Sequence, residues 1–174
     1  GARPQFIKAS ALSSKLNEYK NVEEVLLHTG QHYDDNMSKV FFDELNITKP
    51  KYNLNIKSSL HGEQTGNMIT GIEKIILSEN PNIVLVYGDT NSTVSAAMAA
   101  AKLHIPIAHV EAGLRSFNKR MPEEINRIIT DHVSTKLFTP TITATQNLIR
   151  EGINRTTIKE VGDVMFDATI LFSK

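Results

Sequence analysis

The chain has no cysteine and no net charge, because its 19 lysines and arginines balance its 19 aspartates and glutamates. Without an excess of positive charge it has no overall field to attract nucleic acid or an anionic membrane, so any anion site must be local. No apolar run approaches the roughly 20 residues that span a bilayer, and no signal-like segment is present. The absence of cysteine agrees with the cytoplasm. We therefore expect a soluble cytoplasmic protein with no nucleic-acid or membrane partner.

Several motifs of common catalytic and cofactor sites are also missing. His28 and His32 are four residues apart, but they straddle the end of a predicted strand, and no cysteine or helical histidine pair supports a zinc site. The glycine at the start of the chain forms neither a Walker loop nor a G-x-G-x-x-G, and no G-x-S-x-G elbow of a serine hydrolase is present. We expect no metal site.

Hydrophobic periodicity indicates alternating strands and helices. At 174 residues the chain has the size of one domain, and it opens on a glycine and an arginine of the kind that normally follow a strand, so we expect a first strand upstream. Strands are predicted at 22–30, 52–56, 83–87, 105–110, 136–140 and 158–162, and helices from residue 4, over 36–45, from residue 66, and over 92–103, 121–134, 143–152 and 163–172. This order predicts an open, mostly parallel α/β sheet with helices on both faces.

Two carboxylates follow consecutive apolar strands. Asp89 lies two residues beyond the run 83–87, and Glu111 comes directly after the run 105–110. A right-handed crossover brings the carboxyl ends of both strands to one edge of the sheet, where open α/β sheets bind ligands. If the strands are neighbours, both carboxylates face one pocket and suit acid/base chemistry. A helix cap or turn within "GDTNS" is the alternative for Asp89.

The charges that follow Glu111 have structural and functional interpretations. Glu123 and Glu124, which follow Pro122, can simply complement a helix dipole. Helical spacing puts Ile125, Ile128, Ile129 and His132 on the packed face, with Glu124 nearer to that face than Glu123, and this spacing does not choose between the two glutamates. The four basic residues Arg115, Lys119, Arg120 and Arg127 can form a solvated face.

Two further basic residues lie near the start of the chain. Arg3 and Lys8 belong to the first turn and helix, where backbone N–H groups already favour a phosphate.

Six segments, in this order, resemble the non-hydrolysing UDP-N-acetylglucosamine 2-epimerases over almost the whole chain. They are "GARPQFIK", "TGQHYDDNM", "VLVYGDTNST", "HVEAGLRS", "MPEEINR" and "VGDVMFD". The family has two Rossmann-like lobes in a GT-B-like arrangement, with the active site between them. The resemblance implies that residues 1–174 form a single Rossmann-like N-terminal lobe, that the C-terminal lobe lies outside this chain, and that the complete protein is a homodimer.

The resemblance also implies a reaction and its residues. UDP leaves the anomeric carbon as a proton leaves C2, and UDP then re-adds as C2 is reprotonated on the other face, which yields UDP-N-acetylmannosamine for surface polysaccharide. No metal or redox cofactor is required. The residues matching the family are the catalytic Asp89, Glu111 and Glu123, the substrate-binding Arg3, Lys8, His109 and Arg115, and Gln31 and His32 of a regulatory nucleotide site.

Some features depart from the family and leave alternatives open. Tyr33 stands where many members have arginine, beside the regulatory pair. The short segment "SFNKRM" leaves room for a modified UDP-amino sugar, such as a diacetamido or uronate form. A hydrolysing epimerase and a glycosyltransferase lobe are other enzyme alternatives. We expect no turnover from the 174 residues alone, which could also be an inactive fragment that binds only a ligand or a partner.

Overall fold

The computed structural model describes residues 3–30, 50–57 and 60–172. They belong to two compact units, one made of Gly1–Lys57 and Val164–Lys174 and the other of Ser58–Asp163. The predicted helix at 36–45 lies outside the described residues. That both units form one lobe stays a prediction. No helix in the described ranges is both long and apolar enough to cross a membrane.

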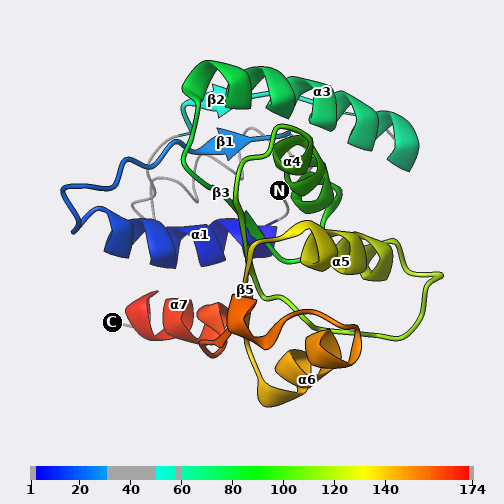
Figure 1. Cartoon of the computed structure of the whole chain (residues 1–174). Coiled ribbons are helices and arrows are strands. Elements are labelled where there is room, and N and C mark those ends of the chain that lie inside the picture. Colours follow the sequence, from blue (N-terminus) through cyan, green and yellow to red (C-terminus); the bar gives the residue numbers. More distant parts are fainter. Residues whose placement is uncertain (1–2, 31–49, 58–59, 173–174) are drawn as a thin grey trace. The chain divides into compact units, whose positions relative to one another are not determined.

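The described residues of the first unit form two helices and a short parallel ladder (Figure 1). Helix α1 (Arg3–Leu16) packs against α7 (Val164–Phe172), and β1 (Leu27–His28) pairs with β2 (Tyr52–Asn53). Both strands lie where they were predicted but are shorter. Beyond the ladder the backbones stay in contact, since the Ile56 amide donates to the Thr29 carbonyl at 3.0 Å. A Cβ on Gly30 would lie 2.6 Å from the Ile56 nitrogen, so this close approach requires glycine.

His28 is a buried histidine of the first unit. Its ring stacks on Phe6 with the ring centroids 5.0 Å apart, and its Nδ1 accepts a hydrogen bond from the Gly30 amide at 3.0 Å. Burial disfavours the charged ring and lowers the pKa of His28 to about 4. The folded protein therefore holds this histidine neutral.

The free energy of unfolding should depend on pH through His28. As pH falls through 6.5, the ordinary pKa of histidine, the unfolded chain takes up a proton that the folded ring excludes until about pH 4. At pH 5 this costs about 2 kcal/mol relative to neutral pH. Urea unfolding at pH 7 and pH 5 should show this loss in the wild type and not in His28→Gln, whose neutral side chain can still accept the Gly30 bond. An equal loss in both proteins would contradict the assignment.

The second unit is built on a four-stranded parallel sheet. Its strands β3 (Val84–Tyr87), β4 (Ile107–Val110), β5 (Lys136–Thr139) and β6 (Ile158–Glu160) pair in chain order. Successive strands are joined by α4 (Asn91–Lys102), α5 (Pro122–Val133) and α6 (Ile142–Arg150). Tyr87 lies opposite Val110, and Val110 lies opposite Phe138, so the carboxyl ends of the first three strands are level. The predicted strand and helix order is confirmed here.

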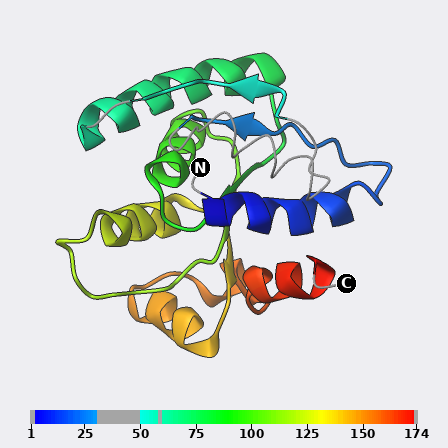
Figure 2. The ribbon, with the colours of Figure 1, turned by 180° about the vertical axis from the view of Figure 1, so that it is seen from behind.

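Helix α3 (His61–Glu79) begins five residues earlier than predicted. Gly66 was taken as the start, but a Cβ there would contact nothing, and the helix continues through this exposed position. The residues Gln64, Met68, Ile72 and Ile76 are buried at four-residue spacing. They pack α3 along α4, as the two views in Figures 1 and 2 show. The alanines Ala97, Ala99 and Ala100 of α4 are also buried, and such small side chains allow close packing.

The face that α5 buries is the opposite of the predicted one. Its buried residues are Glu124, Asn126, Thr130 and Asp131. Ile125 and Ile129 are 44% and 37% exposed, and His132 is also exposed. The prediction was wrong because this helix lies beside turns rich in backbone N–H and C=O groups, which polar side chains must satisfy.

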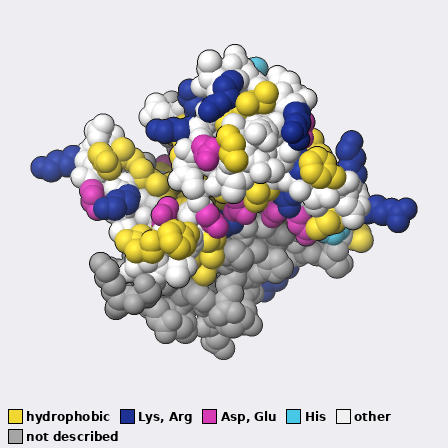
Figure 3. All heavy atoms as spheres, turned by 90° about the horizontal axis from the view of Figure 1, so that it is seen from below, with side chains coloured by type: hydrophobic (Ala, Val, Ile, Leu, Met, Phe, Trp, Pro, Cys, Tyr) yellow, Lys and Arg dark blue, Asp and Glu magenta, His cyan; other side chains and the backbone are white. Residues whose placement is uncertain are grey.

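Apolar side chains are exposed elsewhere as well. Figure 3 shows one face on which hydrophobic side chains lie in separate patches between charged ones.

Candidate functional site

Asp89 and Glu111 follow neighbouring strands. Strands β3 and β4 pair directly, and the Gly88 amide donates to the Val110 carbonyl at 3.0 Å, one residue before each carboxylate. Adjacent strands lie about 4.8 Å apart, so both residues leave the sheet at one edge. The predicted pairing of these two strands is confirmed.

Glu111 has an unusual backbone conformation. Its φ of +73° is left-handed, which is uncommon for a residue with a side chain. The turn is held because the amides of Glu111 and Ala112 both donate to the Phe138 carbonyl at 3.0 Å. Gly113 follows with a φ of +80°. Strained positions of this kind cluster at functional sites, which supports a functional role for the half-buried Glu111.

Asp89 is held by α5 and does not cap α4. Arg127 donates to Oδ2 of Asp89 from Nη2 at 2.7 Å and from Nε at 3.1 Å, and the Asn126 side chain donates to the Asp89 carbonyl at 2.9 Å. The capping residue of α4 is Thr90, whose side chain accepts from the Thr93 amide. The capping alternative for Asp89 is therefore wrong, and its carboxylate has a fixed orientation at the sheet edge.

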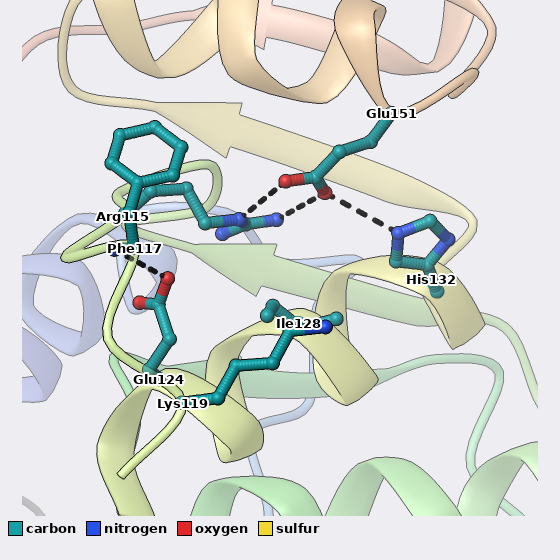
Figure 4. Close-up of a pocket in the computed structure, with 7 residues that line it drawn as sticks. All are labelled: Arg115, Phe117, Lys119, Glu124, Ile128, His132 and Glu151. Atoms are coloured by element: carbon teal, nitrogen blue, oxygen red, sulfur yellow. Dashed lines mark hydrogen bonds and ion pairs between the residues drawn. The ribbon is translucent and has the colours of Figure 1, made fainter. Parts of the chain in front are cut away.

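Glu124 and Glu123 have different environments. Glu124 is buried and accepts hydrogen bonds from the amide of Ser116 at 3.0 Å and from Arg127 at 2.8 Å. It also accepts from the Phe117 amide at 2.9 Å (Figure 4). Burial would raise the pKa of Glu124, but these donors outweigh it and the pKa lies below its ordinary value. Glu123 is exposed at the first turn of α5. Glu124 therefore orders the loop and Arg127, whereas Glu123 is accessible.

Arg115 and Arg127 are not part of a solvated face. Arg115 pairs with Asp131 at 2.7 Å, and its side chain is almost completely buried. It also bonds Glu151 through both Nε and Nη2 at 2.7 Å (Figure 4). Burial lowers the pKa of Arg115, but Glu151 and Asp131 outweigh this and leave it raised. Lys119 and Arg120 are exposed, as the solvated-face prediction requires.

His109 lies in β4, two residues before Glu111, and is fully buried. Its Nδ1 bonds Asp131 at 2.7 Å, and its Nε2 bonds the Gly88 carbonyl at 2.8 Å. His109 was predicted as a site residue, whereas Arg127 was predicted only as part of a solvated face and Asp131 and Asn126 were not predicted at all. The only sequence signal for these three residues is their spacing along one side of α5. Substrate contact by His109 and by Arg115 stays a prediction.

The remaining predicted site residues belong to the first unit or are not described. Lys8 is buried in α1. Arg3 is the first residue of α1, and its side chain is outside the described part. Gln31 and His32 lie outside the described residues. The roles of all four stay predictions.

A cavity of about 340 Å³ lies beside α5. Its lining residues are Arg115, Phe117, Lys119, Glu124, Ile128, His132 and Glu151 (Figure 4). Neither Asp89 nor Glu111 lines it. It shares Glu124 with the network that holds Asp89, through Arg127. The cavity is therefore next to the candidate acid/base residues but does not contain them.

Comparison with known proteins supports the same family. The family model for UDP-N-acetylglucosamine 2-epimerase matches residues 14–174. A UDP-N-acetylglucosamine 2-epimerase homolog of Methanococcus maripaludis is 60% identical over 98% of this chain and 47% of that protein. The UDP-2,3-diacetamido-2,3-dideoxy-D-glucuronate 2-epimerase of Pseudomonas aeruginosa is 57% identical over 100% of this chain and 50% of that protein.

Solved structures agree with the sequence matches. The crystal structure of Methanocaldococcus jannaschii UDP-GlcNAc 2-epimerase in complex with UDP-GlcNAc and UDP has a TM-score of 0.94 and 53% identity, covering 97% of this chain and 46% of that one. The predicted Rossmann-like, GT-B-like fold class is confirmed. The chain spans about half the length of the curated relatives it matches. It belongs to the UDP-N-acetylglucosamine 2-epimerase family.

Proposed function

We propose that the complete protein containing this chain is a UDP-N-acetylglucosamine 2-epimerase. The observation that carries the proposal is the placement of Asp89 and Glu111 at the ends of adjacent strands, with Glu111 in a left-handed conformation. Family membership supports the same conclusion. Since the chain spans about half of its relatives, we propose that turnover requires the complete protein.

The proposed reaction is an elimination of UDP across C1 and C2 followed by its re-addition. A carboxylate of the group Asp89, Glu111 and Glu123 takes the proton from C2, and the C2–H electron pair forms a double bond to C1 as UDP leaves with its bonding electrons. The oxygen of UDP then re-forms the bond to C1, and a protonated carboxyl returns a proton to the other face of C2. Cationic groups assist the departure of UDP, and we propose Arg3 and Lys8 for that role.

A second substrate is favoured by one comparison. The Pseudomonas aeruginosa relative is named for a diacetamido uronate sugar nucleotide and is 57% identical over the whole chain. The short segment between Arg115 and Pro122 leaves room for such a modified UDP-amino sugar. We propose UDP-2,3-diacetamido-2,3-dideoxy-glucuronate as the alternative substrate of the same chemistry.

Solvent exchange distinguishes the candidate functions. The complete protein should be incubated in deuterated water with each of the two UDP sugars, and C2 should be followed by proton NMR. Deuterium at C2 with the UDP sugar retained supports epimerisation, and the sugar with the higher kcat/KM is the substrate. Free UDP that accumulates with free sugar would identify a hydrolysing epimerase. No exchange with either sugar would contradict the proposal and favour a binding-only domain.

Four other features remain proposals. We propose a cytoplasmic homodimer that supplies precursors for surface polysaccharide, with a regulatory nucleotide site at Gln31 and His32. They are supported only by the sequence and by its resemblance to the family.

A further inference from the structure

Asp131 is a buried carboxylate on α5 that contacts the Glu111 turn directly and the Asp89 turn through His109. Its Oδ1 bonds Nδ1 of His109 at 2.7 Å, and its Oδ2 accepts from the Gly113 amide at 3.1 Å. The same Oδ2 forms an ion pair with Arg115 at 2.7 Å. Only 1% of Asp131 is exposed, so solvent cannot replace these contacts.

His109 links Asp131 to the turn that contains Asp89. Both ring nitrogens are in hydrogen-bond contact, Nδ1 with the Asp131 carboxylate and Nε2 with the Gly88 carbonyl. Gly88 directly precedes Asp89. The other oxygen of Asp131 holds Gly113, two residues after Glu111. One side chain thus connects the backbone segments that carry both proposed acid/base residues.

We infer that Asp131 is a positioning residue that sets the Asp89 and Glu111 turns relative to each other. This inference rests on the proposed function. Both oxygens of Asp131 are used, one by the His109 ring and the other by the Gly113 amide and Arg115, and an asparagine would keep only one of these oxygens. Displacing reacting groups by about 1 Å can cost about 100-fold in rate. Loss of the Asp131 contacts should therefore lower the rate of turnover.

The test is Asp131→Asn in the complete protein. We expect kcat for C2 exchange to fall about 10- to 100-fold with a smaller change in KM, because both acid/base turns move while only two of the proposed substrate-binding residues, His109 and Arg115, contact Asp131. Hydrogen exchange followed by mass spectrometry should show faster exchange of backbone amides in segments 86–91 and 110–115. Asp131→Ser, which leaves room for a water molecule, is a second variant in case the first does not fold.

A neighbouring substitution serves as the control. Thr130→Val removes a buried hydroxyl that has no hydrogen-bond partner in the described part of the chain. It should keep kcat within about 2-fold of the wild type, since it does not move the two turns.

Two results would overturn the positioning role: wild-type kcat in Asp131→Asn, or equal losses of kcat in Asp131→Asn and Thr130→Val. The amide-exchange measurement does not depend on substrate. If the wild-type protein turned over neither sugar, the proposed function would fail. Unchanged amide exchange in both segments of Asp131→Asn would still reject the positioning role of Asp131.

Discussion

Replacing Glu111 with glutamine is expected to reduce deuterium incorporation at C2 of the sugar at least about 1,000-fold, near the upper range for loss of an acid/base group. Glutamine keeps the size of the side chain and cannot take or return a proton. The turn should survive, because it is held by the Phe138 carbonyl and not by the Glu111 carboxylate alone. Proton NMR in deuterated water measures the exchange, and thermal unfolding measures the fold.

The matched control is Glu160→Gln. Glu160 is an exposed glutamate at the end of β6, another parallel strand of the same sheet. Its replacement should leave exchange unchanged, because it lies two strands away from Glu111 in the sheet order. Normal exchange in Glu111→Gln would sink the assignment of Glu111 as an acid/base residue.

A glycine at position 111 tests whether the strained conformation serves function. Glycine adopts a φ of +73° without the cost paid by a residue with a Cβ, which is about 1 kcal/mol. Glu111→Gly should therefore be at least as stable as the wild type in urea unfolding while being inactive. A clear loss of stability would show that the Glu111 side chain is needed for the fold.

Replacing Gly113 with alanine is expected to destabilise the protein by about 3–5 kcal/mol, from strained backbone plus overpacking. Gly113 has a φ of +80°, and an added Cβ would collide with the carbonyl oxygen of Ala144, lie 2.8 Å from its carbonyl carbon and 3.0 Å from Cγ of Leu148. Leu148 is fully buried in a core cluster, so it cannot move aside freely. Urea unfolding measures the loss.

Gly152→Ala separates the two causes. Gly152 has a φ of +85°, but nothing lies within 4 Å of its added Cβ. Its replacement should cost only about 1 kcal/mol for the left-handed backbone. Equal losses at Gly113 and Gly152 would contradict the collision and leave backbone strain as the sole cause.

Local sequence was sufficient to predict the type and order of the strands and helices of the second unit. It was also sufficient to place Asp89 and Glu111 at one edge of the sheet. The apolar runs before Asp89 and Glu111 predicted buried parallel strands, and chain order with right-handed crossovers placed both residues at one edge. The lengths of β1 and β2 were overestimated, and only two residues of each strand pair in the ladder. The start of α3 was missed because an exposed glycine does not end a helix.

Tertiary structure alone decided which charges on α5 have structural roles. Helical periodicity turned Ile125 and Ile129 inward, whereas the folded helix buries Glu124 and Asp131 against backbone groups of distant turns. Arg127 meets Asp89 across 38 positions of sequence, and no local pattern encodes that pairing. Hydrophobic periodicity predicts the buried face of a helix from the average preference of helices to pack against an apolar core. The inner side of this helix faces polar backbone, and the cost of leaving those groups unsatisfied outweighs the burial of two isoleucines.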